Sequence, residues 1–489
     1  MEWFSAPEYW LSRLVFQRLM GAIYLVAFLS TANQFRPLLG ADGLLPVPRY
    51  LAAVSFRQAP SIFHWHYSDR FALGLAWAGS ALAAAVVLGL PEQGPLWVSM
   101  TVWFALWALY LSFVNVGQTF YGFIWETLLL EAGFLAIFLG NARTAPPVLT
   151  IWLIRWLLVR LEVGAGLIKL RHDRSWRDLT ALYYHHETQP IPNRLSWYFH
   201  HLPKPVHKAE VVANHVSQLI LPLALLLPQP VAGTAGALVV TTQLWLLLSG
   251  NFAWLNVLTI ALAVPTFHDG MLGRVLPLEA PALEAPSGWF VVVVVALTAA
   301  VVVLSYWPVR NMASPKQLMN CSYNPLRLVN TYGLFGSITR ERHEVVIEGT
   351  DEATPGGEVT WEEYQFKAKP GDPRRRPRQV APYHLRLDWL MWFAPLSPRY
   401  AEGWFLALVA KLLQNDEATL RLLSRNPFPE APPKLVRARL YRYRYTTRAE
   451  RRQSGAVWVR QLVDEYLPPV GLGRRSPTDT SADPSSRVA

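Results

Sequence analysis

The chain has 489 residues, of which 52% are hydrophobic and only 16% charged, and its mean hydropathy is +0.19. This balance argues against an ordinary soluble domain and favours a membrane protein. The net charge of +11 comes without an RNA-binding signature or zinc-ligand spacing, so we predict anionic lipid and no nucleic acid as partner. A single cysteine, Cys321, excludes intrachain disulfides and cysteine-based metal clusters.

Hydrophobic runs that are long enough to span the roughly 30 Å hydrocarbon core recur along residues 1–310. We therefore predict a polytopic α-helical membrane bundle with about nine transmembrane helices. The predicted spans are Leu14–Asn33, Phe71–Leu90, Leu96–Val114, Phe120–Leu139, Val148–Leu170, Val211–Leu227, Ala232–Leu248, Phe252–Phe267 and Trp289–Trp307.

Three long connections separate or follow these spans: 34–70, 171–210 and everything after Val309. With an odd number of spans before each, all three lie on one side of the membrane. Arginine and lysine are commoner there than in the short turns, which alone would place that side in the cytoplasm.

Residues 311–470 change to alternating polar and apolar residues with turns, which predicts a small extramembrane α+β domain. His343–Thr350 and Val359–Lys369 are expected to be strands joined by a Pro-Gly-Gly loop, and Ala401–Leu413 a helix. Tyr383–Phe393 fits a strand or an interfacial segment. Val436–Thr446 alternates with a phase flip at Leu440 and Tyr441, which predicts a bulge. The polar tail 471–489 is expected to be disordered.

Charged residues interrupt two of the predicted spans, where they are costly unless paired or facing a polar cavity. Two interpretations remain open: an ion-pair network that fixes helix register, or a cavity for a ligand. Gly164 and Gly166 would let another element approach closely. The predicted intramembrane charge network consists of Glu126, Glu131, Arg155, Arg160, Glu162 and Lys169.

The connection after the fifth span is dense in Trp, His and acidic side chains and suits either a lid over an active site or an interfacial anchor held by Trp176 and Trp197. His185 and His186 are adjacent, without the spacing of a helical metal pair or a clear third ligand, so no metal is predicted. No motif for a common cofactor or soluble enzyme class appears. The catalytic candidates, if the chain is an enzyme, are Lys169, Asp178, His185, His186 and Glu187.

The segment LVNTYGLFGSITRERHEVVIEGT, residues 328–350, is the densest motif of the C-terminal part. Its glycines permit turns or close approach, and its aromatic side chains suit an anchor for a partner. Core packing is the alternative. The candidate client-binding residues are Asn330, Thr331, Tyr332, Gly333, Phe335 and Gly336.

Three stretches together resemble the lipase maturation factor family: WETLLLEAGFLAIF at 125–138, GAGLIKLRHD and the following residues to 203, and LVNTYGLFGSITRERHEVVIEGT at 328–350. The resemblance spans most of residues 1–470. It implies a membrane-embedded maturation factor or chaperone whose C-terminal domain, 311–470, handles exported client proteins such as lipases, with no cofactor. In the animal members that domain faces the endoplasmic reticulum lumen.

The resemblance places the C-terminal domain outside the cytoplasm, against the arginine count. Abundant Arg and Ala are typical of a GC-rich bacterium, so we expect the bacterial inner membrane, or the endoplasmic reticulum membrane if the source is eukaryotic. The membrane half is also similar to that of vitamin K-dependent γ-carboxylase. This similarity supports an alternative: a membrane enzyme acting on a lipophilic cofactor or substrate.

Overall fold

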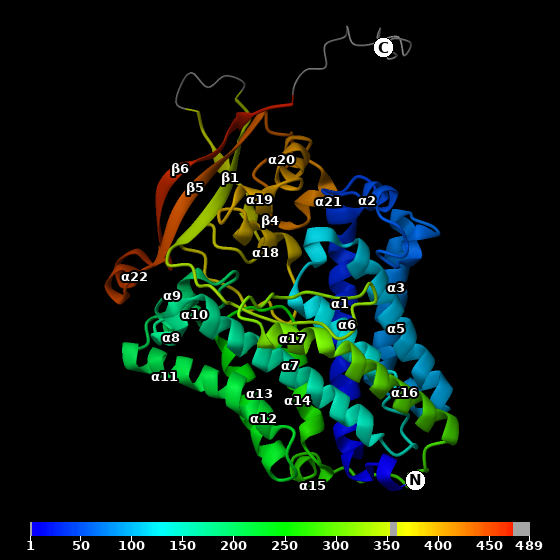
Figure 1. Ribbon diagram of the computed structural model, residues 1–489. Coiled ribbons are helices and arrows are strands. Elements are labelled where there is room, and N and C mark those ends of the chain that lie inside the picture. The colour runs from blue at the N-terminus through cyan, green and yellow to red at the C-terminus, as the bar shows by residue number, and fades with distance from the viewer. Residues whose placement is uncertain (1, 353–358, 473–489) are drawn as a thin grey trace.

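The computed structural model describes residues 2–352 and 359–472. Helices occupy the chain as far as Ala313, and the strands of the main sheet begin at Arg342. Figure 1 shows the helices packed side by side, with the sheet standing at one end of the bundle above α9 and α10. The N-terminus lies at the opposite end.

Five helices in the described part of the chain are long and apolar enough to cross a membrane, which confirms a membrane-embedded helical part. They coincide with five of the predicted spans. Their main helices are α1 (Trp10–Leu39), α3 (Asp69–Leu88), α5 (Leu96–Val116), α13 (Val231–Ser249) and α16 (Gly288–Leu304). The first span begins at Pro7, and the last continues to Ala313.

The count of about nine spans is not confirmed, because the other four predicted runs form helices that are short, broken or charged. The run at 211–227 is interrupted by a π-helical turn, Val216–Ile220, which divides it into two helices. The run at 148–170 is one long helix that carries four charged side chains. These elements are α6 (Ile124–Ala136), α7 (Val148–His172), α11 (Lys204–His215), α12 (Leu221–Ala224) and α14 (Leu255–Ala263).

Short helices fill the connections between the longer ones. Two of them, α9 (Leu182–Thr188) and α10 (Ser196–His200), belong to the long connection after α7 and lie next to the sheet (Figure 1). The others are α2 (Val47–Ala53), α4 (Leu90–Gln93), α8 (Arg174–Arg177), α15 (Asp269–Leu272) and α17 (Tyr306–Ala313).

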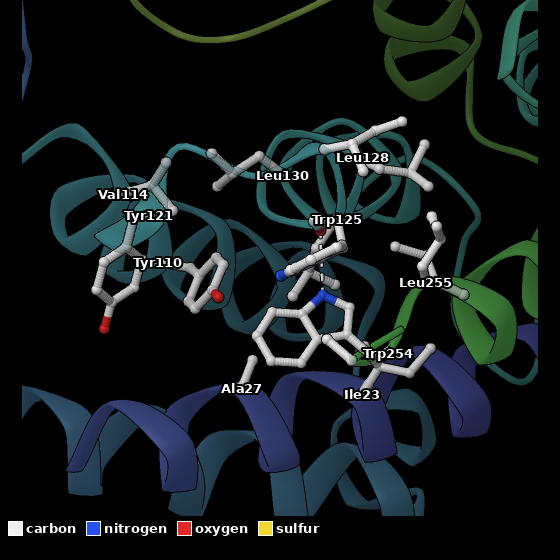
Figure 2. Close-up of a cluster of buried hydrophobic side chains, with 14 of the residues drawn as sticks. Ile23, Ala27, Tyr110, Val114, Tyr121, Trp125, Leu128, Leu130, Trp254 and Leu255 are labelled. Carbon is white, nitrogen blue, oxygen red and sulfur yellow. Dashed lines mark hydrogen bonds between the residues drawn. The ribbon is translucent and has the colours of Figure 1, made fainter. Parts of the chain in front are cut away.

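The bundle core is aromatic where α1, α5, α6 and α14 meet (Figure 2). The indole nitrogen of Trp254 donates to the carbonyl oxygen of Trp125 at 3.0 Å, so this buried polar group is satisfied inside the core. Helices α1 and α3 approach closely at Gly79, where an added Cβ would lie 2.5 Å from the Phe28 ring. A small residue therefore sets the spacing of these two helices.

The C-terminal part contains a four-stranded antiparallel sheet of order β2-β1-β5-β6. The predicted bulge is confirmed, because the pairing of β5 with β6 shifts register between Leu440 and Tyr441. The first predicted strand forms as β1, whereas the second, 359–369, is broken into two short strands that belong to different sheets. Most of the loop expected between them, 353–358, lies outside the described residues. The strands are β1 (Arg342–Thr350), β2 (Glu362–Glu363), β5 (Leu435–Tyr445) and β6 (Trp458–Val470), with β3 (Gln365–Phe366) and β4 (Leu423–Arg425) paired separately.

One predicted element of this part is wrong: 383–393 is neither a strand nor an interfacial segment but contains a buried helix, α18 (Arg386–Phe393). Its buried Leu387, Leu390 and Met391 follow helical spacing. The predicted helix at 401–413 is confirmed as α20 (Phe405–Leu413). The predicted disordered tail lies outside the described residues from 473 onward. The remaining helices are α19 (Pro398–Ala401), α21 (Glu417–Leu420) and α22 (Arg448–Ser454).

Candidate functional site

Glu126 stands in the first turn of α6 and is fully buried. Its carboxylate pairs with Arg386 of α18, Nη1 to Oε1 2.5 Å, and also accepts a hydrogen bond from the Tyr110 hydroxyl. The Arg386 guanidinium lies 3.5 Å from the centre of the Tyr121 ring. Glu126 thus has its cationic partner in the C-terminal part and not on α7, where the sequence led us to look.

Glu131, one turn further along α6, forms a buried ion pair with Arg160 of α7. Its second oxygen accepts from the Asn330 backbone and side-chain amides, both at 3.0 Å, and from the Tyr332 hydroxyl at 2.7 Å. Arg160 in turn donates to the Asn330 carbonyl at 2.9 Å. The Glu131–Arg160 pair fits the expectation of opposite charges meeting on adjacent helices.

Gly164 of α7 allows the same segment to lie directly on the helix. A Cβ at this position would collide with the carbonyl oxygen of Tyr332, which is backbone and has little freedom to move away. Gly166 faces Leu219 instead, at 2.7 Å from an added Cβ. We call the contacts of Glu126 with Arg386, and of Glu131, Arg160 and Gly164 with residues 330–332, the seam between bundle and C-terminal part.

The six candidate client-binding residues lie on this seam and beside it. The side chains of Asn330, Thr331 and Tyr332 are 1–3% exposed, and added Cβ atoms at Gly333 and Gly336 would meet Met319 or Ile168. Phe335 packs edge to face on His185. Direct contact between these residues and a client stays a prediction. In the described structure Asn330, Tyr332, Gly333 and Gly336 lie against α7, whereas Thr331 donates to the Cys321 carbonyl.

A cavity of about 400 Å³ opens on the other side of α7. Its walls come from α7, α9, α11, α13, α14 and residues 334–335. Two charged candidates, Glu162 and Lys169, line it, whereas Arg155 does not and instead bonds the Pro265 carbonyl and the Tyr9 hydroxyl. Of these three charged side chains of α7, only Glu162 and Lys169 therefore face the cavity.

The polar groups of the cavity wall are linked to amide side chains. Gln243 donates to Glu162 at 3.0 Å and accepts from Asn256 at 2.8 Å. Lys169 donates to Gln218 at 2.8 Å and to Asn214 at 3.3 Å. Most of the remaining wall is apolar or aromatic. The cavity thus combines a few polar groups with a mostly apolar lining, which is the usual composition of a small-molecule pocket.

The connection between α7 and α11 was predicted to be either a lid over a site or an interfacial anchor, and different parts of it fit each. His185 and His186 line the cavity together with Trp176. Asp178, which follows α8, is instead about half exposed and pairs with Arg174 of that helix. The Glu187 carboxylate accepts from the Tyr445 backbone amide at 2.7 Å. The catalytic candidates are therefore not brought together as one set.

Burial also alters the acid–base behaviour of this connection. Desolvation, followed by repulsion from His186 and Lys169, lowers the pKa of His185 to about 3. Desolvation raises the pKa of Glu187 above its ordinary value. An imidazole with so low a pKa is neutral near pH 7 and is a weak base there, so the geometry does not favour His185 as a general base.

Arg342 at the start of β1 and Arg340 just before it attach the sheet to neighbouring segments. Arg342 donates to the carbonyls of Glu187 and Pro190, at 2.9 and 3.0 Å, and to Glu344 at 2.8 Å. Arg340 pairs with Asp173 at 3.1 Å. The sheet is therefore fixed to the α7–α11 connection by charge-assisted hydrogen bonds.

Comparison with known proteins covers both parts of the chain. Residues 11–274 match the model described as lipase maturation factor transmembrane domain, and residues 328–468 match the lipase maturation factor C-terminal domain. Lipase maturation factor 1 of Bos taurus is 40% identical, over 95% of this chain and 90% of the relative. The Mus musculus protein of that name is 39% identical, over 95% and 88%.

Lipase maturation factor 2 of Homo sapiens is more distant, at 29% identity over 95% of this chain and 83% of the relative. No solved structure matches. The alternative of a carboxylase-like enzyme receives no support from these matches. With both family models matched and about two fifths of the residues shared along nearly the whole length of a relative, this chain belongs to the lipase maturation factor family.

Proposed function

We propose that the chain is a membrane-embedded maturation factor that assists the folding or assembly of exported proteins, with lipases as the client class. The observation that carries the proposal is the match of both parts of the chain to relatives whose printed name is lipase maturation factor. The bundle supplies attachment to the lipid bilayer, and the C-terminal part supplies protein surface beside it.

Residues 311–470 form the client-handling domain in this proposal, and the outer edge of β6 is its contact surface. Among the described residues no strand pairs with that edge. Leu462 and Val463 on β6 are 49% and 51% exposed. Unpaired strand edges accept extended segments of other chains through main-chain hydrogen bonds, and an incompletely folded lipase offers such segments.

The seam acts indirectly in the same proposal. Asn330, Tyr332 and Arg386 hold the client-handling domain at a fixed position on the bundle through Glu131 and Glu126. A client captured at β6 would thereby be kept at a set distance from the membrane. This assigns the 330–336 motif the role of attachment and leaves the capture of the client to the exposed strand.

For localisation we propose a bacterial inner membrane with the client-handling domain on the extracytoplasmic side. The Arg- and Ala-rich composition supports the bacterial assignment. The side follows from the client class, since an exported lipase folds after it leaves the cytoplasm. Labelling of single cysteines in the domain, in intact cells, tests the side directly.

Site-specific photo-crosslinking tests the function and the surface together. A photoreactive residue placed at Leu462 in the full chain is expected to crosslink to a newly exported lipase, and the yield should fall once the lipase is folded. Tyr400 of α19, which is 52% exposed in the same domain, is the control position and should give little product. Equal crosslinking yields at Leu462 and Tyr400 would contradict the assignment of β6 as the contact surface. Absence of crosslinked lipase at both positions would contradict the proposed function.

A further inference from the structure

Three metal-binding side chains meet at the wall of the cavity. His186 belongs to α9, while His207 and Glu210 lie one turn apart on α11. One potential ligand atom from each side chain lies within 4.8 Å of the other two. The sequence shows no third ligand near His186, because α9 and α11 come together only in the folded bundle.

His186 lacks hydrogen-bond partners among the described residues. Its side chain is 4% exposed, and neither ring nitrogen is hydrogen bonded. The nearest acceptor, Glu210 Oε2, is 4.0 Å from Nε2, which is too far for a hydrogen bond. A buried polar group without a partner is unfavourable, and a bound ion would satisfy one of these two nitrogens.

His207 is oriented as a ligand by its other nitrogen. Nδ1 lies 3.0 Å from Glu210 Oε2, within hydrogen-bond distance. Nε2 lies 3.4 Å from the His200 carbonyl oxygen, which would accept the Nε2 proton when Nδ1 binds an ion. Metal-bound histidines commonly donate their second nitrogen to a backbone carbonyl in this way.

The spacing and the atom types select the metal. In a tetrahedral site with bonds near 2.0–2.1 Å, neighbouring ligand atoms are about 3.3 Å apart. The separations of 3.0 and 4.0 Å from Glu210 Oε2 bracket this value, and all three ligand atoms lie within 4.8 Å of one another. Side-chain movements of up to about 1.5 Å would therefore complete the site. A donor set of two imidazoles and one carboxylate binds zinc in preference to magnesium or calcium, which favour oxygen ligands.

We propose that His186, His207 and Glu210 bind one divalent ion of the zinc type. Glu210 is held for this role by the Trp245 indole, which donates to its other oxygen at 2.8 Å. Because His186 and Glu210 line the cavity, the fourth coordination position faces that space. The ion would join α9 to α11, and a carboxylate or phosphate group of a molecule in the cavity would take the open position.

Metal analysis of the purified full chain in detergent tests the site. A chain without a polyhistidine tag is stripped with EDTA, incubated with zinc sulfate and dialysed. We expect about one zinc per chain. His186→Asn and Glu210→Gln should each weaken zinc binding at least about tenfold, and zinc should raise the melting temperature of the unsubstituted chain more than that of either ligand variant. Cobalt should give the visible bands of a four-coordinate ion.

The matched control is His185→Asn, which changes the neighbouring buried histidine of the same helix and should leave zinc binding intact. Circular dichroism of the zinc-free proteins separates loss of a ligand from loss of the fold. The proposal is overturned if well-folded unsubstituted chain retains no zinc after dialysis, since the three side chains then form only a proton-bridged ion pair. Unchanged zinc binding in both ligand variants would overturn it equally.

Discussion

Helix α7 divides two regions that bury charge in opposite ways. On the seam, Glu131 meets Arg160 directly and its other oxygen is filled by Asn330 and Tyr332. On the cavity side, Glu162 and Lys169 bond to amide side chains around about 400 Å³ of open space. Charge that is fully paired and enclosed is suited to holding two parts together, whereas charge beside an open space is suited to a ligand.

The same substitution on each side of α7 should separate the two regions most strongly. Glu131→Gln leaves Arg160 buried without its carboxylate and should cost about 3–5 kcal/mol of unfolding free energy. Glu162→Gln keeps the acceptor for Gln243 and should cost below about 1 kcal/mol. Denaturation of the purified variants in mixed micelles, followed by circular dichroism, measures both. Equal losses would abolish the distinction between seam and cavity.

A steric clash at the seam should cost less unfolding free energy than the loss of the Glu131 carboxylate. Gly164→Ala places a methyl group against the Tyr332 carbonyl and should destabilise the attachment of the C-terminal part by about 3 kcal/mol. Gly74→Ala on α3, where an added Cβ meets nothing within 4 Å, is the matched control and should be neutral or slightly stabilising. Limited proteolysis of residues 311–341 reports the detachment. Equal protection in both variants would show that the close approach at Gly164 is dispensable.

Acid should weaken the seam by a smaller amount. Burial lowers the pKa of His384, which faces Glu126 and Arg386, to about 4. The unfolded chain, with a pKa near 6.5, binds more protons between these values, so stability is highest above about pH 6.5 and falls toward pH 4. The expected loss is about 2 kcal/mol between pH 7 and 5.

His384→Gln isolates this contribution. The variant should reduce the slope of melting temperature against pH, whereas His185 and His200, each with a pKa lowered to about 3 by burial, keep a residual slope of the same sign. A melting temperature that rises on acidification from pH 7 to 5 would contradict the expected direction of the pH dependence.

Sequence patterns predicted contacts between residues that are close in the sequence and missed those between distant ones. The opposite charges of Glu131 and Arg160 are 29 positions apart on helices that follow one another, so their approach could be anticipated. Arg386 is 260 positions from Glu126, and no periodicity connects them. The phase flip at Leu440 revealed the bulge because strand alternation is a property of neighbouring residues.

The short or charged helices were harder to judge, because apolar runs predict burial without saying whether lipid or protein covers them. Helix α6 is buried along nearly its whole length by protein, which gives it the composition of a span at only 13 residues. The cavity was equally hidden, since α7, α11 and α13 supply its polar groups from positions far apart in the sequence.

Client maturation should depend on the attached C-terminal domain. The test is the specific activity of a secreted lipase in cells that lack this chain and are complemented with variants at equal expression. We expect the unsubstituted chain and His185→Gln to restore lipase activity, and Tyr332→Ala, which removes the hydroxyl bonded to Glu131, to fail. Lipase activity that is unchanged by deletion of the chain, or restored by Tyr332→Ala and not by His185→Gln, would contradict this expectation.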